Sequence, residues 1–409
     1  MSGRLVLGLG GTVDYEIAWD AEVLGGLARE YGLRRAELTA SAPIDDERAL
    51  VAAILAFVDA GAGGERFVAT SQIIERLAER FDKAVTLGGT GVRAGLALER
   101  LGIPSVQHLV SIDDNVRRLM PAAITWVCSA TEDSLDPHLI VQYPVGTRIA
   151  LDDGVIVSEV ADRIIFANDR PNREMAIAPE LATALRGARA FVISGFNTMQ
   201  DETLLARRLD DLEIAMRALP RDALVYYEDA GYYRRELATV ARDRLLPRID
   251  VYGMNEDELQ EYVGRAVDLL DPDAVAGALD EVHRLIPAPA LVVHSRFWSM
   301  SVGPRAARYR ESLDSAVRMS ATRHRLGDAF GAADLADTDR LPRHEAGSRV
   351  VAAVHARRAD AVGLAGRVVD TSHPTTIGLG DSFVGGFLVP VVLPTVSARR
   401  RRVDAAGEG

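Results

Sequence analysis

A short run of glycines and one acid near the end of the chain could hold an anion and activate a hydroxyl group. The run reads Gly378-Leu379-Gly380-Asp381. Glycines permit a tight turn in which successive amide N–H groups converge at the N-terminus of a helix. An aspartate at that point can accept the proton of a hydroxyl that attacks a phosphoryl group. The run therefore predicts a phosphoryl-transfer site with Asp381 as general base. The alternative is that Asp381 only caps a helix.

Acidic side chains also follow two predicted strands. Glu228 ends a strand expected at 223–228, and Asn255 and Glu258 come just after a strand expected at 249–252. Ligands in open α/β sheets gather at the carboxyl ends of the strands, so the two glutamates can meet there. Mg²⁺ is usually held by one or two carboxylates, by waters and by substrate phosphates. The sequence predicts such a site at Glu228, Glu258 and Asn255. The alternative for Asn255 and Glu258 is a capping box.

A second glycine turn and an early carboxylate could contact a substrate. The run Gly88-Gly89-Thr90 opens a predicted helix and allows close approach of a ligand to the backbone. It lacks the lysine of a Walker phosphate loop, which excludes that motif. Asp14 is predicted to lie at the tip of a first strand, where it could bind sugar hydroxyls or serve as a turn residue. Asn197 could supply an amide to the substrate or cap a helix.

The remaining composition excludes several classes of protein. The formal net charge of −12 argues against binding to nucleic acid, and the 8 histidines show no spacing typical of a zinc site. Cys128 is the single cysteine, which fits a reducing compartment, so we expect a cytoplasmic protein. The most apolar late stretch, 383–396, is too short for a membrane span and is interrupted by prolines, so it is interpreted as buried core.

The elements that must position these residues alternate between strand and helix. Such alternation is typical of an α/β fold with a mostly parallel sheet covered by helices on both faces. Strands are expected at 4–9, 84–87, 190–194, 223–228, 249–252 and 289–294, and helices at 46–60, 71–81, 91–101, 179–186 and 234–245.

One interval, 103–169, departs from this rhythm because short β-like runs follow one another without long helices between them. It predicts a separate small sheet that serves as a lid; the alternative is a β-extension used for contact between subunits. The predicted division is a lid of about 12–40 and 103–170, a large nucleotide-binding domain of about 41–102 and 171–397, and a flexible tail at 398–409.

Taken in order, these segments resemble the ADP-dependent glucokinase and phosphofructokinase family, a branch of the ribokinase-like kinases. The segments are the Asp14 turn, Gly88-Gly89, 138–147 through 162–169, Ser194-Gly195, Glu228, 253–259, 293–295 and 378–381. Two departures from the family pattern are Thr12 and Thr90, which stand where the family usually has amide side chains.

The resemblance implies a kinase that transfers the terminal phosphate of ADP or ATP to a sugar or sugar phosphate, with Mg²⁺. By resemblance, Asp381 is the base, the amides of 379–381 form the anion hole, Glu228 and Glu258 associate with the metal, and Asp14 and Gly89 contact the sugar. His294, Gly378 and Gly380 are expected to contact the nucleotide. A monomer or small homo-oligomer is expected. The alternatives are an ATP-dependent sugar or nucleoside kinase and a binding protein that kept the fold without catalysis.

Overall fold

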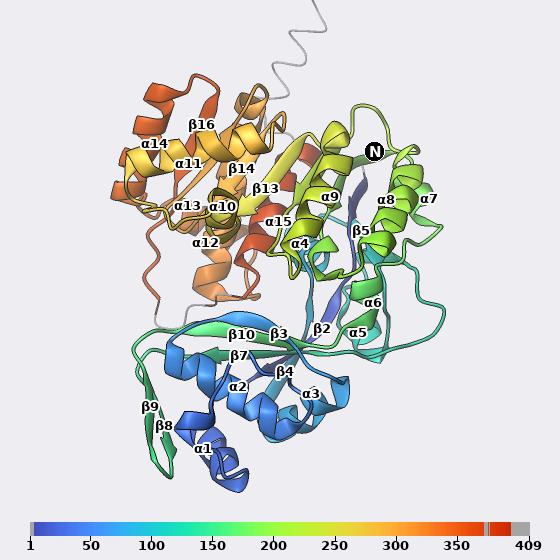
Figure 1. Cartoon of the computed structure of the whole chain (residues 1–409). Helices are drawn as coiled ribbons and strands as arrows, with labels where there is room; N and C mark the ends of the chain where they lie inside the picture. Colours follow the sequence, from blue (N-terminus) through green and yellow to red (C-terminus); the bar gives the residue numbers. More distant parts are fainter. Residues whose placement is uncertain (1–3, 372–374, 376, 394–409) are drawn as a thin grey trace, which may run out of the picture.

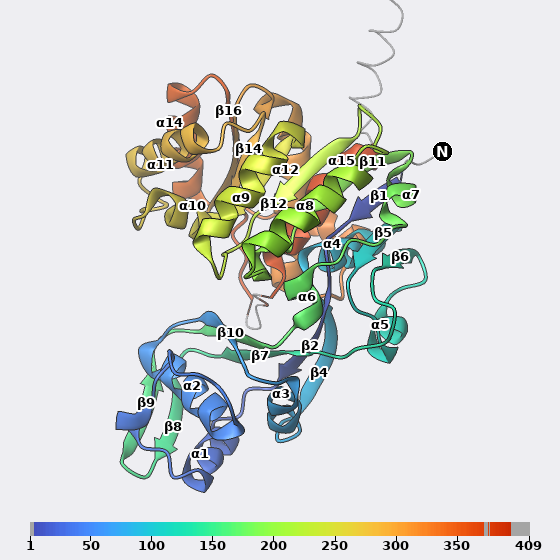
Figure 2. The same cartoon turned by 45° about the vertical axis from the view of Figure 1, so that its right-hand side comes forward.

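Two sheets of unequal size form the framework of the protein (Figure 1; turned in Figure 2). The computed structural model describes residues 4–371, 375 and 377–393. The predicted flexible tail, 398–409, lies outside these residues. Each sheet carries its own helices and its own apolar core, and the chain passes between the two bodies several times.

The larger sheet has nine strands, and most of its neighbouring strands run parallel. The strand order is β16 (Ala361–Ala365), β15 (Trp298–Val302), β14 (Leu291–His294), β13 (Val251–Asn255), β12 (Leu224–Glu228), β11 (Ala188–Ile193), β1 (Arg4–Leu7), β5 (Ser105–Leu109) and β6 (Ile124–Cys128). Strand β15 is antiparallel to both of its neighbours, whereas the other neighbouring pairs are parallel. The predicted α/β class with a mostly parallel sheet is confirmed.

Helices cover both faces of this sheet, because alternate strand residues point to opposite sides. Val6 and Phe191 belong to one apolar core, and Leu5 and Val192 belong to the other. The first core is covered by α7 (Leu181–Leu185), α8 (Glu202–Met216), α9 (Arg235–Leu245), α10 (Glu256–Val263), α11 (Pro272–Leu285) and α14 (Glu345–Arg357). The second is covered by α4 (Thr90–Glu99), α12 (Arg310–Leu326) and α15 (Leu379–Val392). Helix α13 (Ala332–Asp339) packs beside α12.

The smaller sheet has five strands and faces the larger body (Figure 1). Its order is β3 (Gly64–Phe67), β10 (Asp162–Ala167), β7 (His138–Tyr143), β2 (Thr12–Ile17) and β4 (Lys83–Gly88). Its core also contains residues of α1 (Ala21–Glu30), α2 (Glu47–Ala60), α3 (Ser71–Ala78) and of the hairpin formed by β8 (Thr147–Leu151) and β9 (Gly154–Ser158). Two short helices, α5 (Asp114–Leu119) and α6 (Arg170–Glu174), follow β5 and β10.

The predicted domain boundaries differ from the structure in two places. Residues 41–102 were assigned to the large domain, but α2, β3, α3 and β4 pair or pack with the smaller sheet. Strands β5 and β6 were assigned to the lid, but they extend the larger sheet beside β1. The reason is that an apolar periodicity identifies a helix or strand without specifying which sheet it joins. The strands and helices of the smaller body therefore come from 12–88 and 138–167, and its core is completed by Val92, Leu109, Val116, Met120 and Ile124.

Helix α15 runs through the middle of the larger body and ends its described part. Its residues from Ser382 to Leu388 are buried, which agrees with the first part of the stretch 383–396 that was interpreted as core. Residues 389–392 are half-buried, Leu393 is exposed, and 394–396 lie outside the described residues. Within the residues that the structure describes, no helix combines the length and the apolar character that crossing a bilayer requires.

Candidate active site

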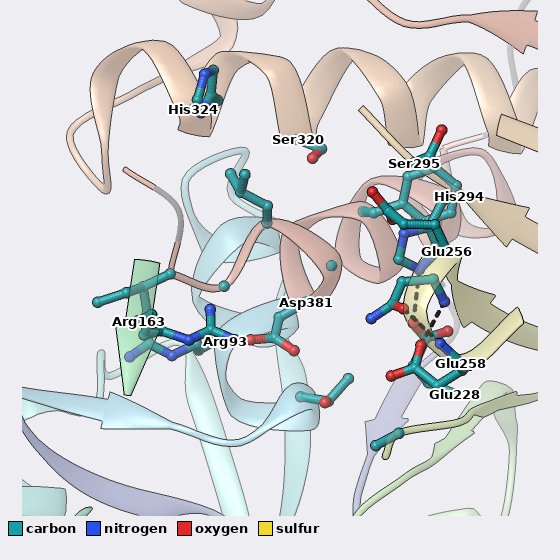
Figure 3. A pocket seen from close by; sticks show the side chains of 18 of the residues that line it. Arg93, Arg163, Glu228, Glu256, Glu258, His294, Ser295, Ser320, His324 and Asp381 are labelled. Atoms are coloured by element: carbon teal, nitrogen blue, oxygen red, sulfur yellow. Dashed lines mark hydrogen bonds and ion pairs between the residues drawn. The ribbon is translucent and has the colours of Figure 1, made fainter. Parts of the chain in front are cut away.

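One cleft between the two sheets contains almost all of the residues singled out from the sequence. Its volume is about 890 Å³ (Figure 3). The predicted site residues that line it are Asp14, Gly89, Thr90, Asn197, Glu228, Asn255, Glu258, His294, Gly378, Leu379, Gly380 and Asp381. Gly88 is the exception, because it ends β4 behind the cleft wall. A Cβ atom there would lie 2.2 Å from Thr12 Oγ1 and 2.3 Å from Asp14 Oδ2, so this glycine leaves room for the Asp14 side chain.

The N-terminus of α15 presents Asp381 to the cleft. Gly378 is the N-cap, with a φ of 67° that favours glycine, and Asp381 stands in the first turn. The cap of this helix is therefore Gly378, which corrects the alternative that Asp381 is the N-cap. Arg323 Nε donates to the carbonyl oxygen of Ile377 at 2.9 Å and so supports the turn from behind. The N-terminus of the helix and the carboxylate thus face the same space.

The acids at the strand ends form a second wall of the cleft (Figure 3). Glu228 accepts a hydrogen bond from Tyr226 Oη at 3.0 Å, and its Oε1 lies 2.9 Å from His294 Nε2. The Glu258 carboxylate accepts a hydrogen bond from the backbone N–H of Asn255 at 2.7 Å. In return, the side-chain oxygen of Asn255 accepts a hydrogen bond from the backbone N–H of Glu258. The capping box therefore exists, and Asn255 and Glu258 line the cleft at the same time.

The positions of Glu228 and Glu258 suit a magnesium ion that also takes oxygen ligands from the substrate phosphates. Burial raises the pKa of Glu258, and the nearby negative charge of Glu228 raises it further. A bound cation would relieve that repulsion. Among the described residues, no three acidic, cysteine or histidine side chains are grouped as a metal cage. Mg²⁺ does not need a cage, because it retains waters and takes phosphate oxygens. Glu228 and Glu258 therefore fit the predicted metal.

A buried acid lies directly beside this pair. Asp229 Oδ2 accepts hydrogen bonds from Tyr252 Oη at 2.7 Å and from Tyr262 Oη at 2.6 Å. Burial raises the pKa of Asp229 from 3.8 to about 6, although the tyrosine hydroxyls act in the opposite direction. The folded protein therefore retains a proton on this carboxyl at a pH where the unfolded chain has released it.

The raised pKa of Asp229 predicts that folding stability falls as the pH rises from about 4 to about 7. Ionising this carboxyl in the folded state costs about 3 kcal/mol relative to the unfolded chain. The asparagine side chain in Asp229→Asn cannot ionise. The unfolding free energy of the variant, taken relative to that of wild type, should therefore increase by about 3 kcal/mol as the pH rises from about 4 to about 7. Urea denaturation of both proteins at several pH values measures the difference. A difference that stays constant with pH would contradict the assignment.

The smaller sheet supplies the opposite wall. Asp14 lies within β2, in the third position of the strand, and not at the tip of the first strand as predicted. Its carboxylate accepts hydrogen bonds from Thr12 Oγ1 at 2.6 Å and from Arg93 Nη2 at 2.7 Å. Asn197 follows β11 of the larger sheet, and its side-chain amide donates to the carbonyl oxygen of Gly231 at 3.3 Å. Both side chains line the cleft while also holding neighbouring residues.

Sequence reasoning did not identify several further cleft residues. Arg163 enters from β10, and His138 from β7 pairs with Asp169 at 3.0 Å. At another part of the cleft, the rings of Phe297 and His344 pack edge to face with centroids 5.0 Å apart. An aromatic wall of this kind suits the flat base of a nucleotide. His138 and Arg163 lie in segments that carry the family resemblance, but no role was predicted for either residue, because their place in the cleft depends on how separate elements pack.

The comparisons with known proteins agree with this geometry. The conserved region of ADP-specific phosphofructokinases and glucokinases matches residues 3–287. No curated protein sequence matches the chain significantly.

Similar solved structures cover 96% of this chain. A phosphofructokinase from Pyrococcus horikoshii OT3 with AMP has a TM-score of 0.75, with 18% identity and 98% of its own chain covered. The last common ancestor of ADP-dependent phosphofructokinases from Methanosarcinales has a TM-score of 0.71, with 15% identity and 95% covered. An ADP-dependent kinase in complex with fructose-6-phosphate and ADPβS has a TM-score of 0.71, with 14% identity and 94% covered. These likenesses establish the fold.

Proposed function

The chain belongs to the family of ADP-specific phosphofructokinases and glucokinases, and on this premise we propose that it transfers the terminal phosphoryl group of ADP to a hydroxyl of a sugar phosphate. The observation that carries the proposal is the shared cleft, in which Asp381 and the N-terminus of α15 lie with the acids Glu228 and Glu258. A phosphotransferase needs these parts within one space, because catalysis rests on positioning and on electrostatic stabilisation.

The residues of the chain account for the transfer as follows. A hydroxyl oxygen of the acceptor attacks the β-phosphorus of ADP, and its proton passes to the carboxylate of Asp381. The new bond joins the acceptor oxygen to phosphorus, and the bond from phosphorus to the α–β bridging oxygen breaks. AMP leaves with that electron pair. The amides of 379–381 at the N-terminus of α15 are directed at the charge on the transferring group.

The metal and the nucleotide are assigned to the other half of the cleft. Glu228 and Glu258 would hold Mg²⁺, directly or through water, and the ion would neutralise charge on the donor phosphates. His294 lies beside Glu228 at 2.9 Å and stacks on Phe383 with ring centroids 4.4 Å apart. These two contacts hold the His294 ring and the Glu228 carboxylate in place in the part of the cleft that is assigned to the phosphates.

A sugar phosphate is preferred over a neutral sugar because of Arg163. This arginine stands on β10, in the wall that the smaller sheet contributes, and it lines the cleft together with Ile140 and Ile165. A guanidinium recognises phosphate oxygens through two parallel hydrogen bonds. A related structure holds fructose-6-phosphate and an ADP analogue. Asp14 and Gly89 are assigned to the hydroxyls of the sugar, as the resemblance implies.

A donor and acceptor panel tests the proposal. ADP and ATP are each supplied with Mg²⁺ and with glucose, fructose 6-phosphate, a pentose or a nucleoside, and nucleotide products are separated by chromatography. We expect AMP to form from ADP with the sugar phosphate. Arg163→Met should raise KM for the sugar phosphate about 10- to 100-fold without changing KM for ADP, because a charge-assisted hydrogen bond is lost. Arg170→Met, on an exposed arginine of α6, is the matched control.

Each other outcome of the panel identifies a rival. Turnover with ATP alone would indicate an ATP-dependent sugar or nucleoside kinase. Faster turnover of glucose than of the sugar phosphate would contradict the role of Arg163. Binding of nucleotide without turnover of any acceptor would favour a protein that kept the fold and lost catalysis.

A further inference from the structure

Arg93 is a buried cation that stands where the proposed reaction gathers negative charge. It lies in the first turn of α4 and is 5% exposed, yet it lines the cleft. A positive side chain in the first turn of a helix is disfavoured by the helix dipole, and burial disfavours any charge. The position of Arg93 is therefore not explained by the stability of α4.

Its side chain passes directly beside the N-terminus of α15. A Cβ atom built on Gly378 would lie 2.9 Å from Arg93 Cδ and 3.3 Å from Asp381 Oδ2. The side chain of Arg93 and the carboxylate of Asp381 therefore flank the same residue, which is the cap of the predicted anion hole. Figure 3 shows Arg93 and Asp381 side by side in the cleft.

A second arginine near Gly378, Arg323, has a different set of contacts. Arg323 Nε approaches the same point, at 3.4 Å, but it donates to the carbonyl of Ile377 and pairs with Asp328. It supports the turn, and it is not among the residues that line the cleft. Of these two arginines, Arg93 is the one that lines the cleft.

The hydrogen bonds and ion pairs of Arg93 keep its guanidinium group charged and fix its position. Nη2 donates to Asp14 at 2.7 Å and to Glu16 at 3.2 Å, and it lies 3.5 Å from Thr86 Oγ1. Burial alone would lower the pKa of Arg93, but the carboxylates of Asp14 and Asp381 raise it overall. These three contacts use one nitrogen, whereas a guanidinium has N–H donors on three. The N–H donors on Nε and Nη1 of Arg93 take no part in the contacts with Asp14, Glu16 and Thr86.

We propose that Arg93 is a catalytic residue that contacts the transferring phosphoryl group, in a reaction whose identity rests on the proposed function. In phosphoryl transfer, negative charge spreads over the three equatorial oxygens of the moving group. A cation that is fixed before the reaction stabilises this charge without reorganisation. Arg93 supplies it from the side of the acceptor, opposite the acids Glu228 and Glu258. The same guanidinium clamps Asp14, which is assigned to the sugar.

Kinetics of Arg93 variants separate catalysis from structural support. Arg93→Met should lower kcat about 10³-fold while KM for ADP changes by about threefold or less, because the interaction forms mainly in the transition state. Arg93→Lys keeps the charge and the pairing with Asp14 but cannot offer the planar donors, so it should retain its thermal midpoint and lose at least about tenfold in kcat. Arg242→Met, at a buried arginine of α9 outside the cleft, is the matched control and should keep wild-type kcat.

A binding measurement makes the test independent of turnover. Nitrate is planar and anionic like the transferring group, so with AMP and Mg²⁺ it mimics the transition state. Calorimetry should show that nitrate tightens AMP binding to wild type and to Arg242→Met but not to Arg93→Met or Arg93→Lys. Equal tightening in all proteins would overturn the proposal, and so would a folded Arg93→Lys with wild-type kcat. A wild-type protein without turnover counts against the proposed function, and the nitrate result then still decides the role of Arg93.

Discussion

Asp381→Asn is expected to lower kcat by about 10³-fold, with KM for ADP and for the acceptor changed by about threefold or less. Asparagine has the shape of aspartate but cannot take a proton from the acceptor hydroxyl. Asp381 stands in the first turn of α15 without capping it, so the substitution leaves the N-terminus of the helix intact. Steady-state rates of AMP formation measure the effect.

Two controls distinguish a loss of catalysis in Asp381→Asn from a loss of folding. Asp211→Asn changes a half-exposed aspartate on α8 that does not line the cleft, and should leave kcat unchanged. The thermal midpoint of Asp381→Asn should stay close to that of wild type, since the change is isosteric. If Asp381→Asn turns over at the wild-type rate, the proton goes elsewhere and the mechanism is wrong.

Gly386→Ala is expected to lower the free energy of unfolding by about 2 to 3 kcal/mol, the usual cost of overpacking a core. A Cβ atom at this position would lie 2.7 Å from both Ala316 Cα and Ser315 O of α12. Backbone atoms of a packed helix cannot yield as a flexible side chain can. Gly385 faces α4 just as closely, 2.9 Å from Ala94 O, so α15 has no free direction in which to shift.

The substitution should also affect the active site, because Asp381 stands in the first turn of the same helix. We expect a reduced kcat together with reduced stability, measured by urea denaturation and by AMP formation. Gly277→Ala, on the exposed side of α11 where a Cβ atom meets nothing within 4 Å, is the matched control. It should raise stability by up to about 1 kcal/mol, because alanine favours a helix. Equal effects of the two substitutions would contradict the packing argument.

The chemistry-bearing turns were predictable from sequence because each carries a local signal. Gly378 and Gly380 announce a turn before Asp381, and Asn255 and Glu258 have the three-residue spacing of a capping box. Parallel strands bring the carboxyl ends of β12 and β13 together, so the nearness of Glu228 to Glu258 follows from the sheet. The alternation of elements likewise predicted the strands β1, β11, β12, β13 and β14 of the larger sheet.

The domain boundaries and the remaining cleft residues depend on how the chain crosses between its two bodies. No local sequence pattern indicates these crossings. Arg163 and Arg93 meet the cleft from different bodies, one on a strand of the smaller sheet and one on a helix of the larger body. Strand β4 and helix α2 have the periodicity of any strand and helix, and only tertiary packing assigns them to the smaller sheet. Phe297 lies just before β15 and His344 caps α14, so only the packing of these two elements brings the rings together.

The most direct test of the account is a crystal structure of the protein with AMP, Mg²⁺ and fructose 6-phosphate bound in the cleft. The account predicts one hydroxyl of the sugar within about 3 Å of an Asp381 carboxylate oxygen, on the side of the α15 N-terminus and facing the nucleotide phosphate. A sugar phosphate bound with every hydroxyl beyond hydrogen-bonding reach of Asp381, or with the nucleotide phosphate directed away from α15, would contradict it.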